Sequence, residues 1–516
     1  MTDAPATVCE MFDIRLERDP DAVVLLTPDG VGRTYAELAD RAAGLVGTLR
    51  SRGVGRGDTV GLYLWNDPAW VVAILGAWWC GCSIAACGAL SPAPEADRRF
   101  RLVGPKVVVA ADDIEPPPGW DVVRVSSEGI PVGPAGVVPG APARFDAERP
   151  GPDDLAAVFF TSGTTGEAKP IGHTHRKLAA GPRTTAAAYA RTPEFRPRTA
   201  PPDKPPALSF NPFGHMAGLG RMIFRIYVGR TLLLVPKFDV AVMGALAERY
   251  PLDTLQLTPA MVHALAFTDA DVKLGSLRYV TSGTAPLPIA TRDVFERRYG
   301  VPVLQAYGST EGGVTALERY EDALAGRRGP GSVGRVAADC PLRIVDHDGH
   351  DLPVGADGEI LGRPDRAASA RYLTSSGQEP LPVDADGWYH SGDVGHLDEH
   401  GILYITGRLK EMMIVGGFNV YPAEVEDALR ASPLVRDAVV VPVPDDRLGE
   451  VPIAGIVWSD PADPEATFAR LAGECRDRLE AYKVPRQWFA LERLPLTPNG
   501  KLDRRRAAEL GSAATA

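Results

Sequence analysis

A short run of hydroxyl-bearing residues and glycines has the composition of a phosphate-binding loop, and its members are Thr161, Ser162, Gly163, Thr164, Thr165 and Gly166. The run directly follows the apolar segment 155–160, and Lys169 stands just beyond it. Glycines let a backbone bend around an anion, while exposed amides and hydroxyls donate hydrogen bonds to phosphate oxygens. On its own this composition is also typical of an ordinary surface loop, and the Gly-Lys-Ser/Thr of a Walker loop is absent.

Other residues suited to binding a nucleotide come later in the chain. The segment 307–311 offers Tyr307 as an aromatic face for a base and Glu311 as a carboxylate for Mg2+. Asp393 can accept hydrogen bonds from ribose hydroxyls, and Arg408 is a donor suited to the same sugar. Taken singly, Asp393 has the ordinary interpretation of an acid at the end of a hairpin. As a set, these residues favour a nucleotide site.

Length and composition narrow the class of protein. A chain of 516 residues is too long for one core and is expected to form about two to four domains. The formal net charge of −11 provides no net basic field, which argues against a general nucleic-acid binder. Six cysteines without a disulfide framework suit a reducing cytosol and predict a cytoplasmic protein. The uncharged segment 69–90 is interrupted by glycines, so a buried helix and strand are favoured over a membrane span.

Apolar segments alternate with helical patterns through most of the chain. The segments expected to be buried strands are 60–64, 106–110, 155–160, 231–235 and 254–257. Helical patterns such as 240–249 lie between several of them, and Thr34 with Glu37 forms a capping box before another helix. This alternation predicts a largely parallel sheet covered on both faces. Two segments rich in proline and glycine, 116–152 and 192–206, are expected to be surface loops.

The end of the chain has the pattern of a small α+β domain. A helix is expected to open at Pro422, with Glu424 in its first turn, where an acid is favourable for the helix dipole. The other expected elements are a helix at 466–480 and strands at 438–443, 453–458 and 487–491.

In their order along the chain, these motifs resemble the ANL superfamily of acyl-CoA synthetases, nonribosomal peptide adenylation domains and beetle luciferases. The resemblance extends from Thr34 to Arg504. It implies an α/β fold, with a large N-terminal domain of mixed α/β sheets and a barrel-like subdomain at 1–409 and a small mobile α+β domain at 410–516. Such enzymes join a carboxylate to AMP, release pyrophosphate, and then rotate the small domain so that a thiol attacks the acyl-adenylate.

The resemblance implies which residues act on the reacting groups. Lys501, on a turn near the C-terminus, contacts the carboxylate and the α-phosphate, Thr310 touches the phosphate, and Glu311 holds the metal. A carboxylate attacking a triphosphate brings two anions together, so Mg2+ and lysines must neutralise the charge that develops in the transition state. ATP and Mg2+ are therefore implied.

The resemblance also implies the contacts of the AMP group. Tyr307 stacks near adenine with Gly308 beside it, while Asp393 and Arg408 hold the ribose. The wall of the adenine site is expected to consist of Gly283, Thr284, Ala285 and Pro286.

A third set of residues points to coenzyme A (CoA). Lys410 stands at the hinge position of the family. Members that use CoA carry glycines where Gly416 and Gly417 stand, because the pantetheine arm passes close to the backbone after rotation. A glycine pair can equally form only a turn. The segment 482–485 is also typical of the CoA-ligase branch, so the predicted function is that of an acyl-CoA ligase.

The identity of the acid depends on a different segment. His215 lies in a stretch that resembles the family's aromatic-or-histidine motif beside the acyl pocket, which makes it a candidate catalytic and pocket residue. Residues 207–238 contain no acid, so the ammonium of an amino-acid substrate would be unpaired, and such a substrate is disfavoured. The other pocket candidates are Gly218, Gly283 and Gly312. Such small residues either leave room for a bulky, mainly apolar acid or pack tightly against backbone.

The phosphate loop departs from the family's usual Gly-x-Pro-Lys-Gly at Ala168 and Pro170. Proline fixes φ at about −65° and removes an N–H where the β- and γ-phosphates are expected to bind. The alternative function is therefore a thioesterification-only ligase that uses a preformed acyl-adenylate. A luciferase-like oxygenase and a domain that loads a carrier protein are further alternatives, and the acid, the thiol and the oligomeric state stay open.

Overall fold

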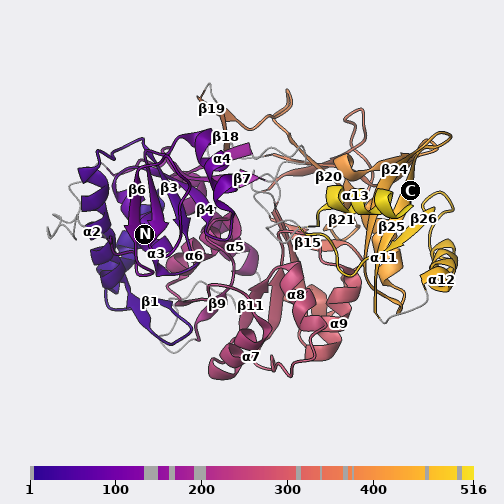
Figure 1. Ribbon diagram of the computed structural model, residues 1–516, viewed down its shortest axis with the longest axis horizontal. Helices are drawn as coiled ribbons and strands as arrows, with labels where there is room; N and C mark the ends of the chain where they lie inside the picture. The colour runs from indigo at the N-terminus through magenta and orange to yellow at the C-terminus, as the bar shows by residue number, and fades with distance from the viewer. Residues whose placement is uncertain are drawn as a thin grey trace.

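Four β-sheets and their flanking helices make up the part of the chain that the computed structural model describes. This part consists of residues 5–132, 149–161, 169–190, 205–308, 315–337, 340–363, 370–374, 377–459, 464–496 and 502–515. In Figure 1 the N-terminal elements, drawn in indigo, lie at one end of the long axis, and the C-terminal elements, drawn in yellow, lie at the other.

An eight-stranded sheet in the order β19-β18-β8-β7-β4-β3-β5-β6 lies in the N-terminal part. Its strands are β3 (Thr59–Leu64), β4 (Ser83–Gly88), β5 (Val107–Ala111), β6 (Val122–Val125), β7 (Leu155–Thr161), β8 (Lys169–Thr174), β18 (Arg371–Thr374) and β19 (Gly377–Pro380). Strands β3 to β7 pair in parallel, as the alternating pattern predicts, whereas β8, β18 and β19 form an antiparallel edge.

Helices cover both faces of this sheet because successive side chains of a strand point to opposite faces. Leu62 belongs to a core shared with helices on one face, whereas the next residue, Tyr63, packs on the other face with Phe100. The helices of the first face are α1 (Val8–Arg18), α2 (Tyr35–Ser51), α3 (Pro68–Trp79), α5 (His175–Ala190) and α6 (Met216–Val228), and α4 (Ala93–Val103) supplies Phe100. The predicted capping box is present at the start of α2.

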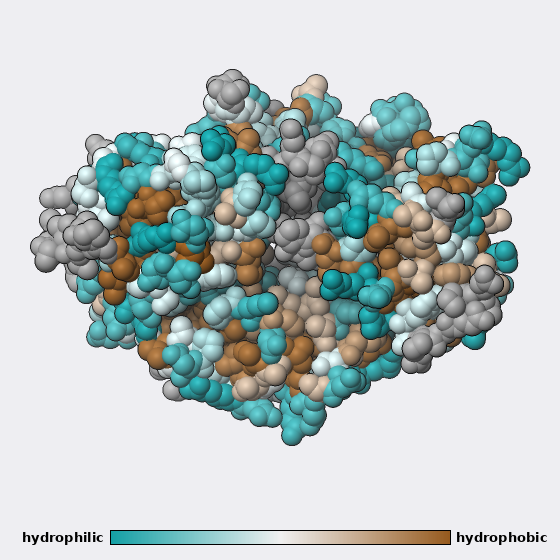
Figure 2. All heavy atoms as spheres, in the orientation of Figure 1, coloured by the Kyte–Doolittle hydropathy of each residue, from teal (hydrophilic) through white to brown (hydrophobic). Residues whose placement is uncertain are grey.

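The uncharged segment 69–90 forms buried structure as predicted. Helix α3 is buried along its whole length and leads directly into β4. None of the helices in the described parts of the chain is long and apolar enough to cross a membrane. On the face shown in Figure 2, hydrophobic residues form separate brown patches among hydrophilic ones.

Two further sheets continue the large domain. A four-stranded sheet, β2-β1-β10-β9, consists of β1 (Val23–Leu26), β2 (Gly32–Thr34), β9 (Ala207–Ser209) and β10 (Leu232–Leu234). A nine-stranded sheet, β11-β12-β13-β14-β15-β21-β20-β17-β16, consists of β11 (Thr254–Leu257), β12 (Tyr279–Ser282), β13 (Val303–Gly308), β14 (Thr315–Leu317), β15 (Ser332–Val336), β16 (Leu342–Val345), β17 (Gly358–Gly362), β20 (Tyr389–Leu397) and β21 (Ile402–Arg408). Their helices are α7 (Val240–Arg249), α8 (Pro259–Ala266), α9 (Ile289–Tyr299) and α10 (Tyr320–Leu324).

The C-terminal part has a sheet and cores of its own. After the 3-10 turn η1 (Leu409–Glu411), its sheet has the order β23-β22-β25-β24, with β26 beside β25. The elements are β22 (Met413–Val415), β23 (Phe418–Val420), β24 (Val435–Asp445), β25 (Gly449–Trp458), β26 (Gln487–Ala490), α11 (Pro422–Arg430), α12 (Pro464–Arg476) and α13 (Arg504–Thr515). Two apolar clusters lie entirely within these elements and their connections. Helix α11 also contacts β21 and α9 of the preceding part.

Two expectations for loops met different outcomes. The prediction that 116–152 is only a surface loop is wrong in part, because β6 lies within it and pairs in parallel with β5. Segment 192–206 falls almost wholly outside the described residues, which resume at 205.

We expect buried His173 to make folding sensitive to acid. Its side chain is 1% exposed and packs edge-on against Phe159, and burial lowers its pKa to about 3. A lowered histidine pKa gives stability that is present above the unfolded value, about 6.5, and is lost as the pH falls. Between pH 7 and pH 5 the histidine becomes protonated in the unfolded chain but not in the folded one. This difference lowers the free energy of unfolding by about 2 kcal/mol.

Urea unfolding at pH 7 and at pH 5 checks this expectation with His173→Leu. The variant should lose about 2 kcal/mol less stability than the unaltered chain across this interval. Equal losses in both proteins would show that His173 does not carry this acid sensitivity.

Candidate active site

Asp393 and Arg408 form an ion pair on two neighbouring strands. They are direct partners in the antiparallel pairing of β20 with β21, which places both side chains on one face of the sheet. The Arg408 Nε lies 2.7 Å from Asp393 Oδ1. Asp393 is buried, whereas the Arg408 side chain is half-exposed, so the pair joins the sheet interior to its surface. A carboxylate fixed in this way is suited to accept hydrogen bonds from a diol such as ribose.

Tyr307 contacts this pair from β13 of the same nine-stranded sheet. Its hydroxyl donates a hydrogen bond of 2.5 Å to Asp393 Oδ2, although the two residues are 86 positions apart in the chain. Burial, and then the charge of Asp393, raise the pKa of Tyr307 well above its usual value, so the phenol stays protonated and remains a donor. The hydroxyl contact therefore fixes the direction of the aromatic ring.

The expected adenine wall lies directly beside Tyr307. Gly283 follows the end of β12, and a Cβ at this position would come within 2.9 Å of the Ala306 carbonyl oxygen on β13. Only glycine allows this approach of the two strands. The wall residues Thr284, Ala285 and Pro286 follow, so the structure brings the wall, Tyr307, Asp393 and Arg408 to one region of the sheet.

Thr284 has an unusual backbone conformation. Among the described residues it is the only non-glycine with a positive φ, which is 75°. For a β-branched residue this conformation is strained, and such strain is typical of functional loops.

Replacing Thr284 by glycine should relieve this strain. We expect Thr284→Gly to increase the free energy of unfolding by about 1 kcal/mol. The matched control is Thr281→Gly in the regular strand β12, which should decrease it. Urea midpoints of the two variants measure the difference, and a decrease for Thr284→Gly would contradict the assignment of strain.

The end of the predicted phosphate loop is described, and it lies in a strand. Lys169 begins β8, is exposed, and has its ammonium 6.0 Å from the ring centre of Tyr372. Pro170 is the next strand residue and pairs with Phe160 of β7. The position at which the chain departs from the family's usual loop sequence, Pro170, is therefore part of β8.

The pocket candidates lie at the start of α6. His215 is the N-cap residue of this helix and is half-buried. A Cβ on Gly218 would overlap the Pro212 carbonyl oxygen, because the first turn of α6 packs on the preceding backbone. The sequence left open whether these small residues make room for the acid or pack tightly against backbone. For Gly218 and Gly283 the structure supports tight packing against backbone.

The expected CoA residues form the tip of a hairpin. Gly416 and Gly417 connect Val415 to Phe418, and both have positive φ, 58° and 89°. Two such residues form the tight turn that suits the twist of a hairpin. An added Cβ at Gly417 would meet no atom within 4 Å, so the tip is open on that side. Lys410 lies in η1.

Several predicted site residues lie outside the described part of the chain. They are Ser162, Gly163, Thr164, Thr165, Gly166, Thr310, Glu311, Gly312 and Lys501. Thr161 is described only as the last backbone position of β7, paired with Lys169. Their roles stay predictions from the sequence.

Residues 12–372 match the AMP-binding enzyme family, and residues 424–501 match the C-terminal domain of AMP-binding enzymes. The chain belongs to the AMP-binding enzyme family. This result confirms the resemblance to the ANL superfamily, and the relatives place the chain in its acyl-CoA ligase branch, whose members are AMP-forming acid–thiol ligases.

Named relatives cover nearly the whole chain. One is the 3-[(3aS,4S,7aS)-7a-methyl-1,5-dioxo-octahydro-1H-inden-4-yl]propanoyl:CoA ligase of Rhodococcus jostii, 31% identical over 97% of this chain and 98% of its own. Another is the indoleacetate–CoA ligase of Aromatoleum aromaticum, 30% identical over 91% of each chain. ATP-bound MatB from Rhodopseudomonas palustris is 27% identical, has a TM-score of 0.83 and covers 98% of each chain. The predicted fold class, a large N-terminal domain of mixed sheets with a small C-terminal domain, is confirmed by this likeness.

The described residues fit a nucleotide. A buried carboxylate, an adjacent guanidinium and an oriented phenol converge beside a wall that only glycine permits. The direct contact between Tyr307 and Asp393 and the strain at Thr284 are not predicted by the sequence motifs. The contact joins motifs that are far apart in the chain, so no short stretch of sequence indicates it. The strain is a property of the backbone angle φ, which residue types do not show.

Proposed function

We propose that this chain is an acyl-CoA ligase that activates a carboxylic acid with ATP and transfers the acyl group to CoA. The observation that carries the proposal is the arrangement of Tyr307, Asp393 and Arg408 beside the wall that starts at Gly283. The named relatives of this chain are CoA ligases, and the match covers nearly their full length.

The first half-reaction requires neutralisation of negative charge. A carboxylate oxygen attacks the α-phosphorus of ATP, the bond to the β-phosphate oxygen breaks, and pyrophosphate leaves with its electron pair. In our proposal Asp393 and Arg408 hold the ribose, Tyr307 orients the base, and Lys501 and Thr310 bind at the α-phosphate. Mg2+, held by Glu311 when bound, would neutralise charge that develops on the phosphates.

The second half-reaction forms the thioester. The CoA sulfur attacks the acyl carbon, and AMP leaves with the electrons of the acyl–oxygen bond. We assign the route of the pantetheine arm to the hairpin tip at Gly417, because that tip is open and carries no side chain. The rotation that presents this tip is assigned to a hinge at Lys410, between parts 1–409 and 410–516. The separate apolar clusters of the C-terminal part support this boundary.

The acid is proposed to be bulky and mainly apolar rather than an amino acid. The names of relatives that act on a bicyclic propanoate and on indoleacetate support this class. The absence of acids in 207–238 supports it too, since an ammonium would lack a partner there. Room for the acid does not come from Gly218 or Gly283, because backbone occupies the space beside both.

The thioesterification-only alternative is not favoured. Of the two residues that motivated it, Ala168 lies outside the described residues, and Pro170 lies in β8 opposite Phe160. The named relatives are CoA ligases. A cytoplasmic location is part of the proposal. It is supported by Cys9, Cys80, Cys82, Cys87 and Cys475, which are free thiols in the structure.

Product analysis tests the proposed function. Carboxylic acids of graded size and polarity are incubated with ATP, Mg2+ and CoA, and mass spectrometry detects acyl-CoA and AMP. A bulky apolar acid should give equal amounts of both products, and amino acids should give neither. If a carrier-protein thiol were acylated and free CoA were not, the assignment of CoA would be wrong.

A further inference from the structure

A partly buried ion network in the C-terminal part is centred on Arg504, the first residue of α13. The Arg504 Nε donates to Glu411 Oε2 at 3.0 Å, and its Nη1 and Nη2 donate to the two carboxylate oxygens of Glu426. Nη1 also donates to the Val440 carbonyl oxygen at 3.0 Å. One guanidinium therefore joins three elements, which are η1, α11 and β24.

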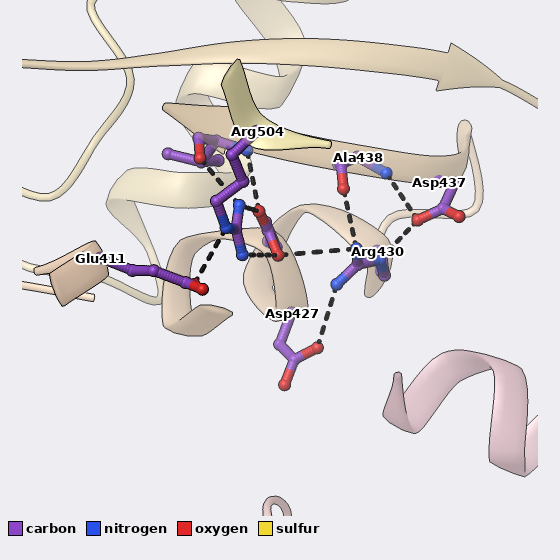
Figure 3. A network of polar contacts seen from close by, with 8 residues as sticks. Glu411, Asp427, Arg430, Asp437, Ala438 and Arg504 are labelled. Carbon is purple, nitrogen blue, oxygen red and sulfur yellow. Dashed lines mark hydrogen bonds and ion pairs between the residues drawn. The ribbon is translucent and has the colours of Figure 1, made fainter. Parts of the chain in front are cut away.

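The Glu426 side of this network belongs to the core. The Glu426 side chain is 4% exposed and also accepts the Val440 N–H at 2.9 Å. Arg430 continues the network with a 2.7 Å bond to Asp437 and a 2.7 Å bond to the Ala438 carbonyl oxygen. In Figure 3 the Arg430 group and Glu411 lie on opposite sides of Arg504. Arg504 thus ties Glu411 to a rigid centre.

Glu411 differs from the other partners because it is next to the proposed hinge. It is the last residue of η1 and directly follows Lys410. The turn itself is closed by the Met412 N–H, which donates to the Arg408 carbonyl oxygen at 3.1 Å. A residue bound to the domain core cannot take up the φ/ψ change that a hinge absorbs, so the change must fall on residues before it.

The other end of the network adjoins the described residues on either side of Lys501. Leu496 and Leu502 form an antiparallel bridge, and the Asp503 N–H donates to the Pro495 carbonyl oxygen at 2.9 Å. Arg504 follows immediately. The Arg504 side chain therefore holds the small-domain end of the hinge, and its backbone lies two residues after the Leu496–Leu502 bridge.

We propose that Arg504 is a positioning residue that holds Glu411 and the Leu496–Leu502 bridge in one rigid frame, so that domain rotation is confined to residues up to Lys410. This inference rests on the proposed two-step function. It explains how one small domain can present two different surfaces accurately, since both must move as parts of a single body.

The test uses Glu411→Gln rather than a change of Arg504, because loss of Arg504 would leave buried Glu426 with only its longer, 3.6 Å ion pair to Arg430 and would destabilise the domain. Glu411 is 33% exposed, and it is the one contact of Arg504 with η1 among the described residues. The matched control is Arg506→Gln in the same helix, whose ion pair with Glu509 is exposed.

Hydrogen exchange reports the clamp without requiring activity. In Glu411→Gln, the amides of 409–413 should exchange about fivefold faster, which corresponds to the loss of a partly exposed charged contact. Exchange in α11 should stay unchanged, and Arg506→Gln should match the unaltered chain. Unchanged exchange at the hinge, or faster exchange throughout α11, would overturn the proposal. Because this readout is independent of catalysis, its failure is distinct from failure of the proposed function.

Kinetics, normalised to titrated active sites, give the second readout. Glu411→Gln should lower kcat of both half-reactions by about fivefold and leave the KM for ATP unchanged. Burial lowers the pKa of Arg408, but the charge of Asp393 and, after it, the charge of Glu411 raise this pKa above its usual value. An effect through Arg408 would instead raise the KM for ATP and leave kcat intact, and this result would overturn the proposal.

Discussion

Lys501→Ala is expected to reduce acid-dependent pyrophosphate exchange by about 100- to 1000-fold, the usual loss for one preorganised charge donor. The reason is that two anions meet in adenylation, and an ammonium at the α-phosphate offsets the charge that develops. Thioester formation from supplied acyl-adenylate should fall much less, because the proposed rotation moves Lys501 away before that step.

Two controls sharpen this prediction. Arg505→Ala removes a nearby exposed cation of α13 and should leave both half-reactions unchanged. Lys501→Arg keeps the charge but changes its shape, so it should restore only part of the exchange. Equal losses in the two half-reactions of Lys501→Ala would contradict the assignment of Lys501 to adenylation alone.

Gly417→Leu is expected to have the opposite profile. A side chain at the open hairpin tip would occupy the proposed route of the pantetheine arm, and misplacement of a reactant by about 1 Å can cost about 100-fold. Thioester formation from supplied adenylate should fall by about this factor, whereas pyrophosphate exchange should continue.

The positive φ of Gly417, 89°, adds a second effect that the experiment must separate. Gly417→Asn is the control, because asparagine tolerates left-handed backbone with a smaller side chain. Its loss should be clearly smaller than that of leucine. Normal CoA turnover by Gly417→Leu would refute the proposed route, and equal losses for both variants would assign the effect to backbone strain.

The sequence predicted those parts of the fold whose signal is local. The capping box at Thr34, the change from α3 to β4 and the buried strand β7 follow from patterns of a few residues. Strand β6 was missed because its four residues lie within a segment rich in proline and glycine. That strand depends on its pairing with β5, which is a tertiary contact.

The site could be predicted only as separate motifs. The residue types of Tyr307, Asp393 and Arg408 suggested a nucleotide, but the hydrogen bond between Tyr307 and Asp393 spans 86 positions. Gly218 shows a different limit, because an absent side chain has the same appearance in a sequence whether it opens a pocket or admits backbone. No sequence motif indicates the Arg504 network, because Glu411 and Glu426 are 93 and 78 positions away from Arg504 in the chain.

Pyrophosphate exchange by the unaltered enzyme tests the central claim most directly. With the acid identified by product analysis, labelled pyrophosphate should enter ATP at a rate that depends on both the acid and Mg2+, and addition of CoA should then yield acyl-CoA and AMP. Absence of exchange, together with rapid conversion of a supplied acyl-adenylate to acyl-CoA, would contradict the claim that this chain activates its own acid.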